Sequence, residues 1–336
     1  MKNAAVIALV MVSAFSAKAQ DIHFSQFFFA PQWLNPAEIG QFDAQYRGTA
    51  NQKTQWREVS QPYTTFALAA DGRPDFLPEN TAVGMAVMND RAGDSRFNTF
   101  SVLAGGSYTY KIKDSNRHLL TGALQLGFTQ VSLNQDALRF DNQFNGVAFD
   151  PTLPTGESFA RNSRIHANVN LGAAYTFNYA PGKKLVAGWA GHNLTRPDRS
   201  FFNETGIDLP LRHAYYVTGD WNILPDIDLL PAMRYMRQRT FSEFVIGTAV
   251  RYVLINERNL YRSVFAGYFG RLGDSGIGLI GMEIDDWRAG ISYDINMSNL
   301  TVASRNRGGF EFSLQYLFNR QPRNAGFNHR FCPTYI

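Results

Sequence analysis

The residue types that most often carry out catalysis or bind metals are sparse in this chain. Its six histidines, at 23, 118, 166, 192, 213 and 329, and its single cysteine show neither the H-x-x-x-H nor the Cys-His spacing of a zinc site. A Gly-Asp-Ser-Gly sequence at 273–276 could expose a nucleophilic serine. These residues are strong turn formers between two alternating segments, which favours a tight hairpin instead. The sequence therefore predicts no enzymatic activity, no metal site and no cofactor.

Paired carboxylates could also support acid-base chemistry or bind calcium. Asp226 and Asp228 share one face of a predicted strand, and we interpret them as inward polar residues near the start of that strand. Asp141, Asp150 and Glu157 lie in a long predicted loop and could bind calcium. No EF-hand spacing accompanies them, so solvated loop carboxylates are the simpler interpretation.

The elements that would position these residues are predicted from alternating hydrophobicity. Near the end of the chain, Phe310, Phe312 and Leu314 share one face with Tyr316 and Phe318, and polar residues occupy the other face. Segments of about ten residues with this alternation are typical of transmembrane β-barrel strands. They recur near 44–56, 62–71, 81–90, 97–112, 118–132, 164–178, 183–194, 211–222, 226–238, 241–253, 260–271, 274–284, 286–295 and 308–319.

The predicted fold class is therefore all-β, a transmembrane antiparallel β-barrel of roughly 14 strands. A soluble β-sandwich could alternate as well, but the number and length of the segments favour the barrel. The polar face of the segments should line the lumen, which would hold water, a plug or a peptide. The candidate lumen-lining residues are His166, Asn168, Asn170, Arg234, Arg288, Asp294, Glu311 and Gln315.

Loop length predicts the orientation of the barrel. The long connections near 133–163, 195–210 and 296–307 all follow odd-numbered strands, so they lie at one end. Outer-membrane barrels have long outer loops and short periplasmic turns, which would place both mature termini in the periplasm. The candidate outer-loop residues are Asp141, Asn142, Asp150 and Arg196.

The N-terminus predicts export from the cytoplasm, and together with the predicted barrel it indicates the cell outer membrane as the location. Lys2, the apolar stretch from Ala4 to Phe15 and the Ala17-Lys18-Ala19 sequence have the order of a secretory signal peptide. The expected organisation is a signal peptide at 1–19, a periplasmic or plug-like segment at 20–43, the barrel at 44–319 and a periplasmic tail at 320–336. The formal charge is +4 and no basic run occurs, so we expect no nucleic-acid partner. The predicted barrel would be surrounded by outer-membrane lipid.

The segment that opens the mature chain fits neither a helix nor a strand. Aromatic residues crowd around Pro31 and Pro36, which interrupt regular structure. Such a backbone cannot face lipid with its polar groups unpaired, so it should pack on the periplasmic rim or enter the lumen. It would close the barrel or present a partner surface. The candidate partner-binding residues are His23, Phe24, Ser25, Gln26, Phe27, Trp33, Leu34, Asn35 and Pro36.

The same segment resembles the start of the PorP/SprF family of membrane proteins, which serve the type IX secretion system of Bacteroidetes. The matching sequences are His23–Phe27, Leu34–Ala37, Tyr46-Arg47 and Asn51–Trp56. Further similarity occurs at Asp141-Asn142-Gln143 with Gly146, Phe149-Asp150-Pro151, Gly156-Glu157, Asn193–Pro197 and Cys332-Pro333. Between 226 and 300 only the strand pattern is similar.

The resemblance implies a barrel that supports the export or surface anchoring of proteins such as gliding adhesins. It also implies partners: a cargo with a C-terminal sorting domain, and periplasmic or outer-membrane components of the secretion system. Two other functions share the predicted fold. One is a diffusion porin for small solutes, and the other is a barrel hydrolase that would use His192 or His213 at one rim.

Overall fold

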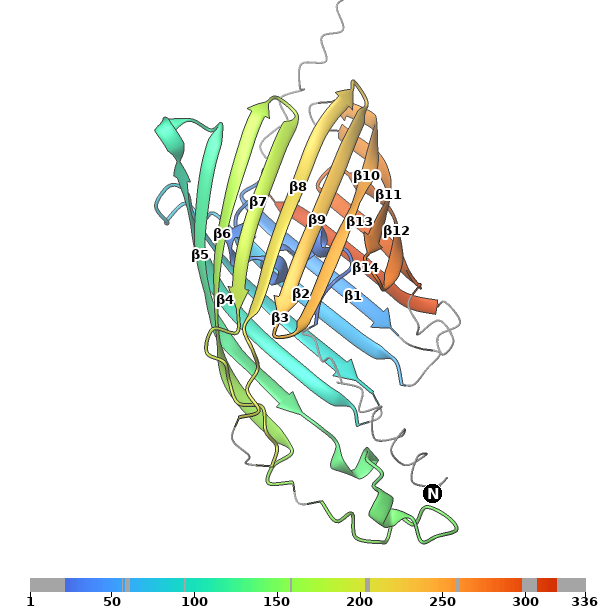
Figure 1. Ribbon diagram of the computed structural model, residues 1–336. Coiled ribbons are helices and arrows are strands. Elements are labelled where there is room, and N and C mark those ends of the chain that lie inside the picture. The colour runs from blue at the N-terminus through green and yellow to red at the C-terminus, as the bar shows by residue number, and fades with distance from the viewer. Residues whose placement is uncertain are drawn as a thin grey trace, which may run out of the picture.

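Fourteen antiparallel strands form a closed barrel in the described part of the chain, and β1 completes the circle by pairing with β14 (Figure 1). The computed structural model describes residues 22–55, 57, 61–93, 95–157, 159–202, 206–257, 260–297 and 307–318. The predicted all-β barrel of 14 strands is confirmed. The predicted signal peptide and C-terminal tail, with Trp56 and Cys332, lie outside the described residues.

The strand boundaries follow the predicted segments closely. The strands are β1 (Tyr46–Gln55), β2 (Tyr63–Gly72), β3 (Thr81–Ala92), β4 (Phe97–Lys111), β5 (His118–Ser132), β6 (Ser163–Ala180), β7 (Lys183–His192), β8 (Arg212–Leu224), β9 (Ile227–Gln238), β10 (Phe241–Glu257), β11 (Leu260–Arg271), β12 (Ser275–Ile284), β13 (Trp287–Asn296) and β14 (Arg307–Phe318). The largest difference is in β10, which continues past the predicted residue 253 to Glu257. The register shifts between Val253 and Ile255, and such an irregularity interrupts the alternation that reveals a strand.

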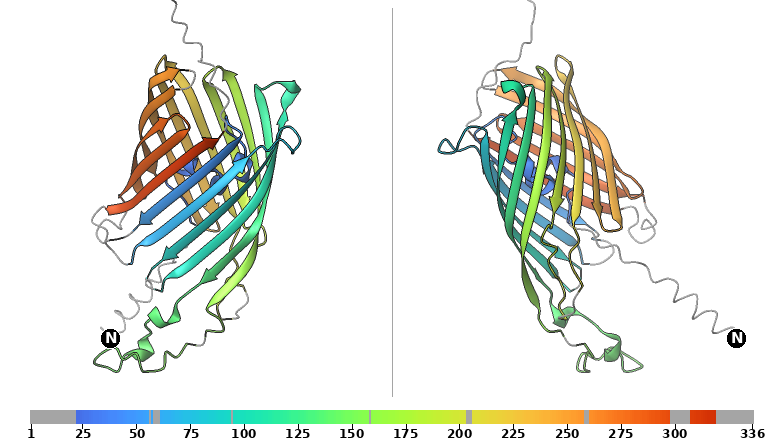
Figure 2. Two further views of the ribbon diagram at one scale, coloured as in Figure 1. Left: turned by 180° about the vertical axis from the view of Figure 1, so that it is seen from behind. Right: turned by 60° about the vertical axis from the view of Figure 1, so that its left-hand side comes forward.

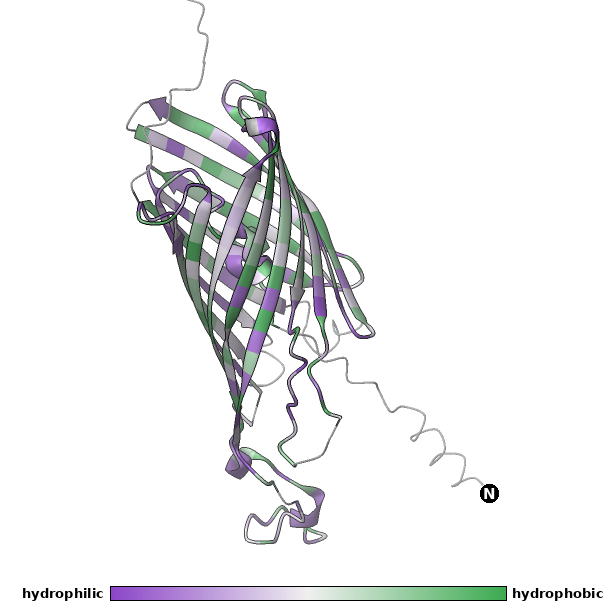
Figure 3. Ribbon diagram, turned by 90° about the vertical axis from the view of Figure 1, so that its left-hand side faces the viewer, coloured by the Kyte–Doolittle hydropathy of each residue, from purple (hydrophilic) through white to green (hydrophobic). Residues whose placement is uncertain are grey.

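Alternation separates an apolar outer surface from a polar interior. Along β14, Phe310 and Phe312 are exposed on the outer surface, and Glu311 and Ser313 are buried. Hydrophilic and hydrophobic residues accordingly alternate along the strands in Figure 3. Because side chains of a strand point to opposite faces in turn, one sequence pattern specifies both surfaces.

The two ends of the barrel differ in their connections. One end, the long-loop end, carries the connections 133–162 and 193–211, and the first of these contains the short helices η4 (Gln135–Ala137) and η5 (Asp141–Gln143) (Figure 1). The other end, the short-turn end, has two-residue turns at 181–182, 225–226 and 285–286 and the helix η3 (Ile112–Asp114). Gly182 has φ +70° and Asp285 has φ +51°, the left-handed conformations that two-residue hairpin turns require.

Residues 22–43, which we call the lumen segment, lie inside the barrel (Figures 1 and 2). The segment contains η1 (Phe27–Phe29), α2 (Pro31–Leu34) and η2 (Pro36–Glu38). Pro31 and Pro36 each occupy a first helical position, where the missing N–H costs no hydrogen bond. The prediction left two places open for this segment, the rim and the lumen, and the lumen is the one observed.

The lumen segment runs along the barrel from one end toward the other. The carbonyl of Ile22 accepts a 3.2 Å hydrogen bond from Arg212, at the long-loop end of β8. The carbonyls of Phe42 and Ala44 accept hydrogen bonds from Arg73, at the short-turn end of β2. The first described residue therefore lies toward the long-loop end. The predicted mature N-terminus, residue 20, is outside the described residues.

Candidate functional site

Ser25 is the centre of a buried polar network that joins the lumen segment to the barrel wall. Its backbone N–H donates to Glu311 at 2.7 Å, and its hydroxyl donates to Asp294 at 2.7 Å. The ammonium group of Lys53 donates to the Ser25 hydroxyl and to the carbonyl of His23, both at 3.1 Å. Arg271 also donates to this hydroxyl, at 3.0 Å. Strands β14, β13, β1 and β11 supply these four charged groups, so one serine fixes the segment to four strands.

Gln26 adds a second contact to the same glutamate. Its backbone N–H donates to Glu311 at 2.9 Å, and its side-chain amide donates to the carbonyl of that residue at 3.0 Å. Glu311 thus receives two backbone N–H groups that no helix or sheet of the segment uses. Buried backbone groups need partners, and here a barrel carboxylate supplies them.

Glu243 of β10 is the second centre of charge in the lumen. It forms salt bridges with Arg234 of β9 and with Arg271 of β11, the latter at 3.2 Å, and its Oε2 lies 2.9 Å from Nε2 of His23. Arg234 also donates to the carbonyl of Phe24 at 2.9 Å. Buried charges are tolerated when they are paired and hydrogen-bonded, so the lumen segment completes a network that the wall alone leaves incomplete.

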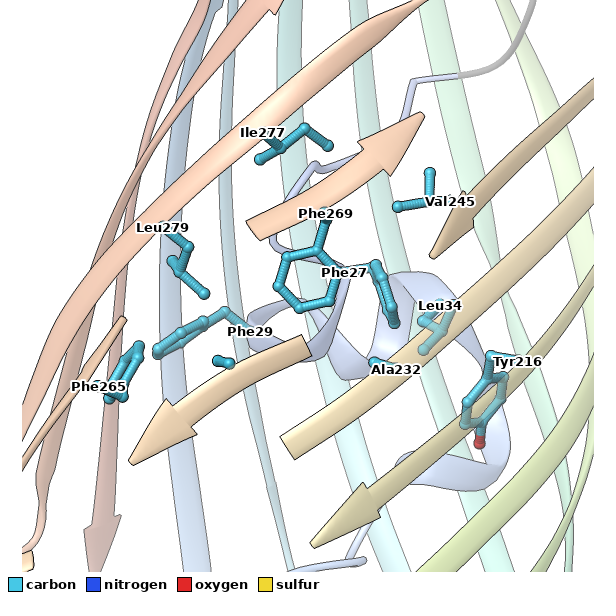
Figure 4. Packing of buried hydrophobic residues seen from close by; sticks show 11 residues of the cluster. Phe27, Phe29, Leu34, Tyr216, Ala232, Val245, Phe265, Phe269, Ile277 and Leu279 are labelled. Carbon is cyan, nitrogen blue, oxygen red and sulfur yellow. The ribbon is translucent and has the colours of Figure 1, made fainter. Parts of the chain in front are cut away.

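Aromatic packing fills the space beside these charges. Phe27 and Phe29 are buried in one apolar cluster with Phe265 and Phe269 of β11 (Figure 4). The guanidinium of Arg234 lies 5.0 Å from the Phe27 ring centroid. Cations over aromatic faces attract the ring electrons, so the same side chains bind both the charged and the apolar parts of the interface.

Asn35 fixes the far side of the lumen segment against β6. Its side-chain oxygen caps η2 by accepting from the N–H of Ala37 at 2.8 Å, and its amide donates to the carbonyl of Ala173 at 3.0 Å and to the Tyr216 hydroxyl at 3.3 Å. The Tyr216 hydroxyl in turn donates to Glu38. The segment can approach β6 this closely because residue 172 is glycine: a Cβ there would lie 2.1 Å from Oδ1 of Asn35.

Replacing Gly172 by alanine should therefore push the lumen segment away from β6. We expect the free energy of unfolding to fall by about 1–3 kcal/mol, the usual cost of overpacking a tight contact. Urea unfolding of the purified barrel in phospholipid vesicles measures this change. Gly122→Ala is the matched control, because Gly122 pairs with Ala173 on the neighbouring strand and a Cβ there meets nothing within 4 Å. Equal stability of the two variants would show that the contact at Gly172 is unimportant.

An ion pair holds the segment at the short-turn end. The Nη2 atom of Arg47 lies 2.7 Å from Oδ2 of Asp71, and the same oxygen accepts from the backbone N–H of Gly40 at 2.7 Å. Arg47 also donates to the carbonyl of Glu38 at 2.9 Å, and its guanidinium lies 4.5 Å from the Phe42 ring centroid. These contacts attach the end of the lumen segment to the start of the barrel.

A cavity of about 280 Å³ remains between the lumen segment and the wall. Phe28, Glu38 and Phe42 line it on the segment side, and Asp220, Arg251 and Arg288 line it on the wall side. Arg251 is paired there with Asp220 at 3.0 Å and with Asp228 at 2.7 Å. The cavity could bind a small polar group or a side chain, and two of its charged residues, Asp220 and Arg251, are already paired with each other.

The predicted lumen-lining and partner-binding residues lie together inside the barrel. The eight candidate lumen-lining residues all lie on the inner face, where Asp294, Glu311 and Arg234 contact the lumen segment directly. The candidate partner-binding residues lie inside the barrel, and Phe24, Ser25, Gln26, Phe27, Leu34, Asn35 and Pro36 are buried there by contacts within the chain. His23 and Trp33 are half-buried.

Three residues of the network were missed by the sequence prediction, namely Lys53, Glu243 and Arg271. A signal was available for Lys53, because it shares the inner face of β1 with Arg47 and Asn51. Glu243 and Arg271 also occupy inward positions of alternating strands. The alternation predicts the face of the strand on which Glu243 and Arg271 lie, but it does not predict that these residues contact the lumen segment.

The candidate outer-loop residues lie on or near the long-loop end. Asp150 accepts hydrogen bonds from the backbone and hydroxyl of Thr152, at 2.9 and 2.6 Å, which lower the pKa of its carboxyl group. Asn142 donates to the carbonyl of Thr155 at 3.3 Å, and Asp141 begins η5. No group of three or more His, Cys, Asp or Glu side chains suited to a metal ion occurs among the described residues.

The two histidines considered for hydrolysis do not share a site. His192 is buried in the lumen with Nε2 3.3 Å from the carbonyl oxygen of Leu34. His213 packs against Trp189 on the outer surface, with ring centroids 6.1 Å apart. Ser275, from the Gly-Asp-Ser-Gly sequence, accepts a 3.0 Å hydrogen bond from Arg271 next to the turn at Gly273. None of these groups forms a catalytic arrangement with another among the described residues.

Solved structures with a similar fold are outer-membrane barrels. The toluene transporter TbuX of Ralstonia pickettii aligns with a TM-score of 0.51 and 11% identity over 86% of this chain and 93% of that one. The toluene transporter TodX of Pseudomonas putida aligns with a TM-score of 0.50 and 9% identity over 88% and 94% of the two chains. At these identities the likeness shows the fold alone.

Sequence comparison identifies the family. A search of curated proteins found no match. Among the described residues, no helix has the length and apolar character needed to cross a membrane. The family model described as type IX secretion system membrane protein PorP/SprF matches residues 16–316, which include the lumen segment and the whole barrel up to β14. This chain therefore belongs to the PorP/SprF family of type IX secretion system membrane proteins.

Proposed function

We propose that this barrel is a non-enzymatic outer-membrane component of the type IX secretion system that supports the export or surface anchoring of a cargo protein. The cargo would be a protein such as a gliding adhesin, bound through its C-terminal sorting domain. The membership of this chain in the PorP/SprF family supports a place for the barrel in this secretion system.

The occupied lumen is the observation that carries the proposal. Contacts from the lumen segment reach opposite walls of the barrel, from Glu311 on β14 to Ala173 on β6. A diffusion porin needs a continuous water-filled path, and buried hydrogen bonds to charged side chains of the wall hold this segment across that path. The structure therefore favours a barrel that binds partners at its two ends over a pore for small solutes.

The long-loop end offers the larger surface for a cargo. The loop 133–162 projects beyond the strands in Figures 1 and 2, and it exposes Val147, Phe144 and Phe149. Exposed apolar side chains on a loop held by a rigid barrel are typical of binding surfaces. The short-turn end would face the periplasmic components of the secretion system.

The experiment replaces residues 136–158 by a short Gly-Ser linker in the chromosomal gene. The loop can be shortened there because the N–H of Leu133 already bonds the carbonyl of Asn162 at 3.0 Å, which keeps its base together. We expect the variant barrel to reach the membrane and the amount of surface cargo to fall toward that of a strain without the protein. Quantitative mass spectrometry of surface proteins measures the amount of cargo.

The matched control shortens the connection 74–78, which lies at the opposite end of the barrel. Cargo display should persist in that strain if the long-loop end binds cargo. Unchanged surface proteins after complete deletion of the gene would contradict the proposed function as a whole. Loss of display after both loop changes, with normal barrel levels, would contradict cargo binding by the long loop.

A further inference from the structure

A row of aromatic side chains crosses the outer surface of β7, β8, β9 and β10 near the long-loop end. Trp189 pairs with Tyr215, Tyr215 with Tyr235, and Tyr235 with Phe244 in the strand register. The ring centroids of Tyr215 and Tyr235 are 6.2 Å apart, and those of Tyr235 and Phe244 are 6.5 Å apart. Outer-membrane barrels carry such aromatic girdles where the hydrocarbon region meets the headgroups. The row therefore marks the lipid boundary on this wall.

Cationic side chains follow directly beyond the aromatic row. His213 pairs with Arg237 in the strand register. Both residues occupy the next outward position after the tyrosines in the direction of the long-loop end, about 7 Å along the strands. Arg239 follows at the hairpin, and Arg196 lies in the adjacent loop. Arg196, Arg237 and Arg239 are all exposed. These residues lie at the depth where lipid headgroups would be.

The cations and the tyrosines line one groove on the outer surface. Its volume is about 770 Å³, and its lining includes Arg196, Asp208, Tyr215, Tyr235, Arg237 and Arg239. Asp208 is the acidic residue of the lining, and it lies 3.5 Å from Arg239, with both side chains substantially exposed. Arg196 and Arg237 form no ion pair with any of the described residues. The groove therefore retains positive charge that no carboxylate of its lining neutralises.

The local backbone holds Arg196 at the groove. Arg196 has φ +42° and Asn193 has φ +61°, and the N–H of Arg196 bonds the carbonyl of Asn193 at 3.0 Å in a tight turn. The following part of the loop is tied down by a bond from the N–H of Leu209 to the carbonyl of Pro197 at 2.8 Å. Left-handed conformations are unfavourable for arginine, so its side chain is directed here by the surrounding fold.

We propose that this groove binds the phosphate-bearing headgroup of an outer-membrane lipid. Arginine guanidinium groups match phosphate oxygens with two parallel hydrogen bonds, and three arginines converge here at headgroup depth. The neighbouring tyrosines offer apolar faces to the sugar or the first acyl carbons of the same lipid. An acidic segment of a protein would satisfy the charge as well, but it would have to lie among lipid headgroups against the two tyrosines of the groove.

The test uses the full-length barrel purified in detergent and native mass spectrometry with added lipid. The probes are lipid A with its phosphates, enzymatically dephosphorylated lipid A and inorganic phosphate. The variant is Arg196→Gln with Arg237→Gln. Arg91→Gln is the matched control, because Arg91 is an exposed outward arginine at the same end of the barrel on strand β3. A heat-dependent shift on gels verifies that every variant is folded.

The wild type and Arg91→Gln should bind phosphorylated lipid A equally. The double variant should bind it roughly tenfold or more weakly, since charge-assisted hydrogen bonds are lost. Equal binding by the double variant would overturn the proposal. Equal binding of dephosphorylated lipid A would show that the phosphate is not recognised and would also overturn it. Binding of inorganic phosphate as strong as that of lipid A would identify a free-anion site instead, and capture of an acidic protein with no bound lipid would identify a protein interface.

Discussion

Replacing Glu243 by alanine should destabilise the protein by about 3–5 kcal/mol, the usual cost of breaking a buried ion pair. The carboxylate lies between Arg234 and Arg271 and within 2.9 Å of His23. Without it, Arg234 keeps its hydrogen bond to the carbonyl of Phe24 and its contact with the Phe27 ring but loses its carboxylate partner. The guanidinium groups of Arg234 and Arg271 then repel each other in a buried space. Urea unfolding in phospholipid vesicles measures the loss.

Two further variants separate the contribution of the charge from other effects. Glu243→Gln keeps the shape and one acceptor oxygen, so it should lose less stability than the alanine variant. Glu257→Ala removes an exposed glutamate from the same strand and should change stability by no more than about 0.5 kcal/mol. If the Glu243 and Glu257 variants were equally stable, the lumen network would not contribute to the fold.

Deleting residues 22–40 should convert a closed barrel into a conducting one. Barrels of about eight strands are filled by their own side chains, whereas barrels of 16–18 strands leave an aqueous channel. A barrel of 14 strands lies between these cases and here uses its own N-terminal segment to fill the interior. Without this segment, the inward charges of Lys53, Arg271 and Glu311 would face water. Single-channel recording in planar bilayers measures the conductance.

The wild type and the variant with the shortened 136–158 loop are the controls, and both should conduct far less than the deletion variant. The loop variant also lacks part of the chain but keeps the lumen segment, so it shows whether a deletion elsewhere is enough to raise the conductance. Conductance of the wild type as high as that of the deletion variant would mean that the lumen segment does not close the path. The porin function would then be preferred over partner binding.

The sequence alone determined the number of strands, their bounds within a few residues and the face on which each side chain lies. It could do so because the two-residue period of a strand is local: Glu311 must point inward when Phe310 and Phe312 point outward. Loop lengths separated the two ends of the barrel for a similar reason, since consecutive connections alternate between ends. Both properties depend on neighbouring residues in the chain and require no knowledge of distant contacts.

Only the tertiary structure decided what the lumen segment does. Residues 22–43 have no period, and one partner of Ser25, Glu311, is 286 positions away in the chain. Which inward residues meet across a barrel depends on the stagger and curvature of all its strands, and alternation within one strand carries no information about them. Sequence reasoning therefore placed Glu311 and Asp294 in the lumen but did not bring them to Ser25, and it missed Glu243 as the partner of two buried arginines.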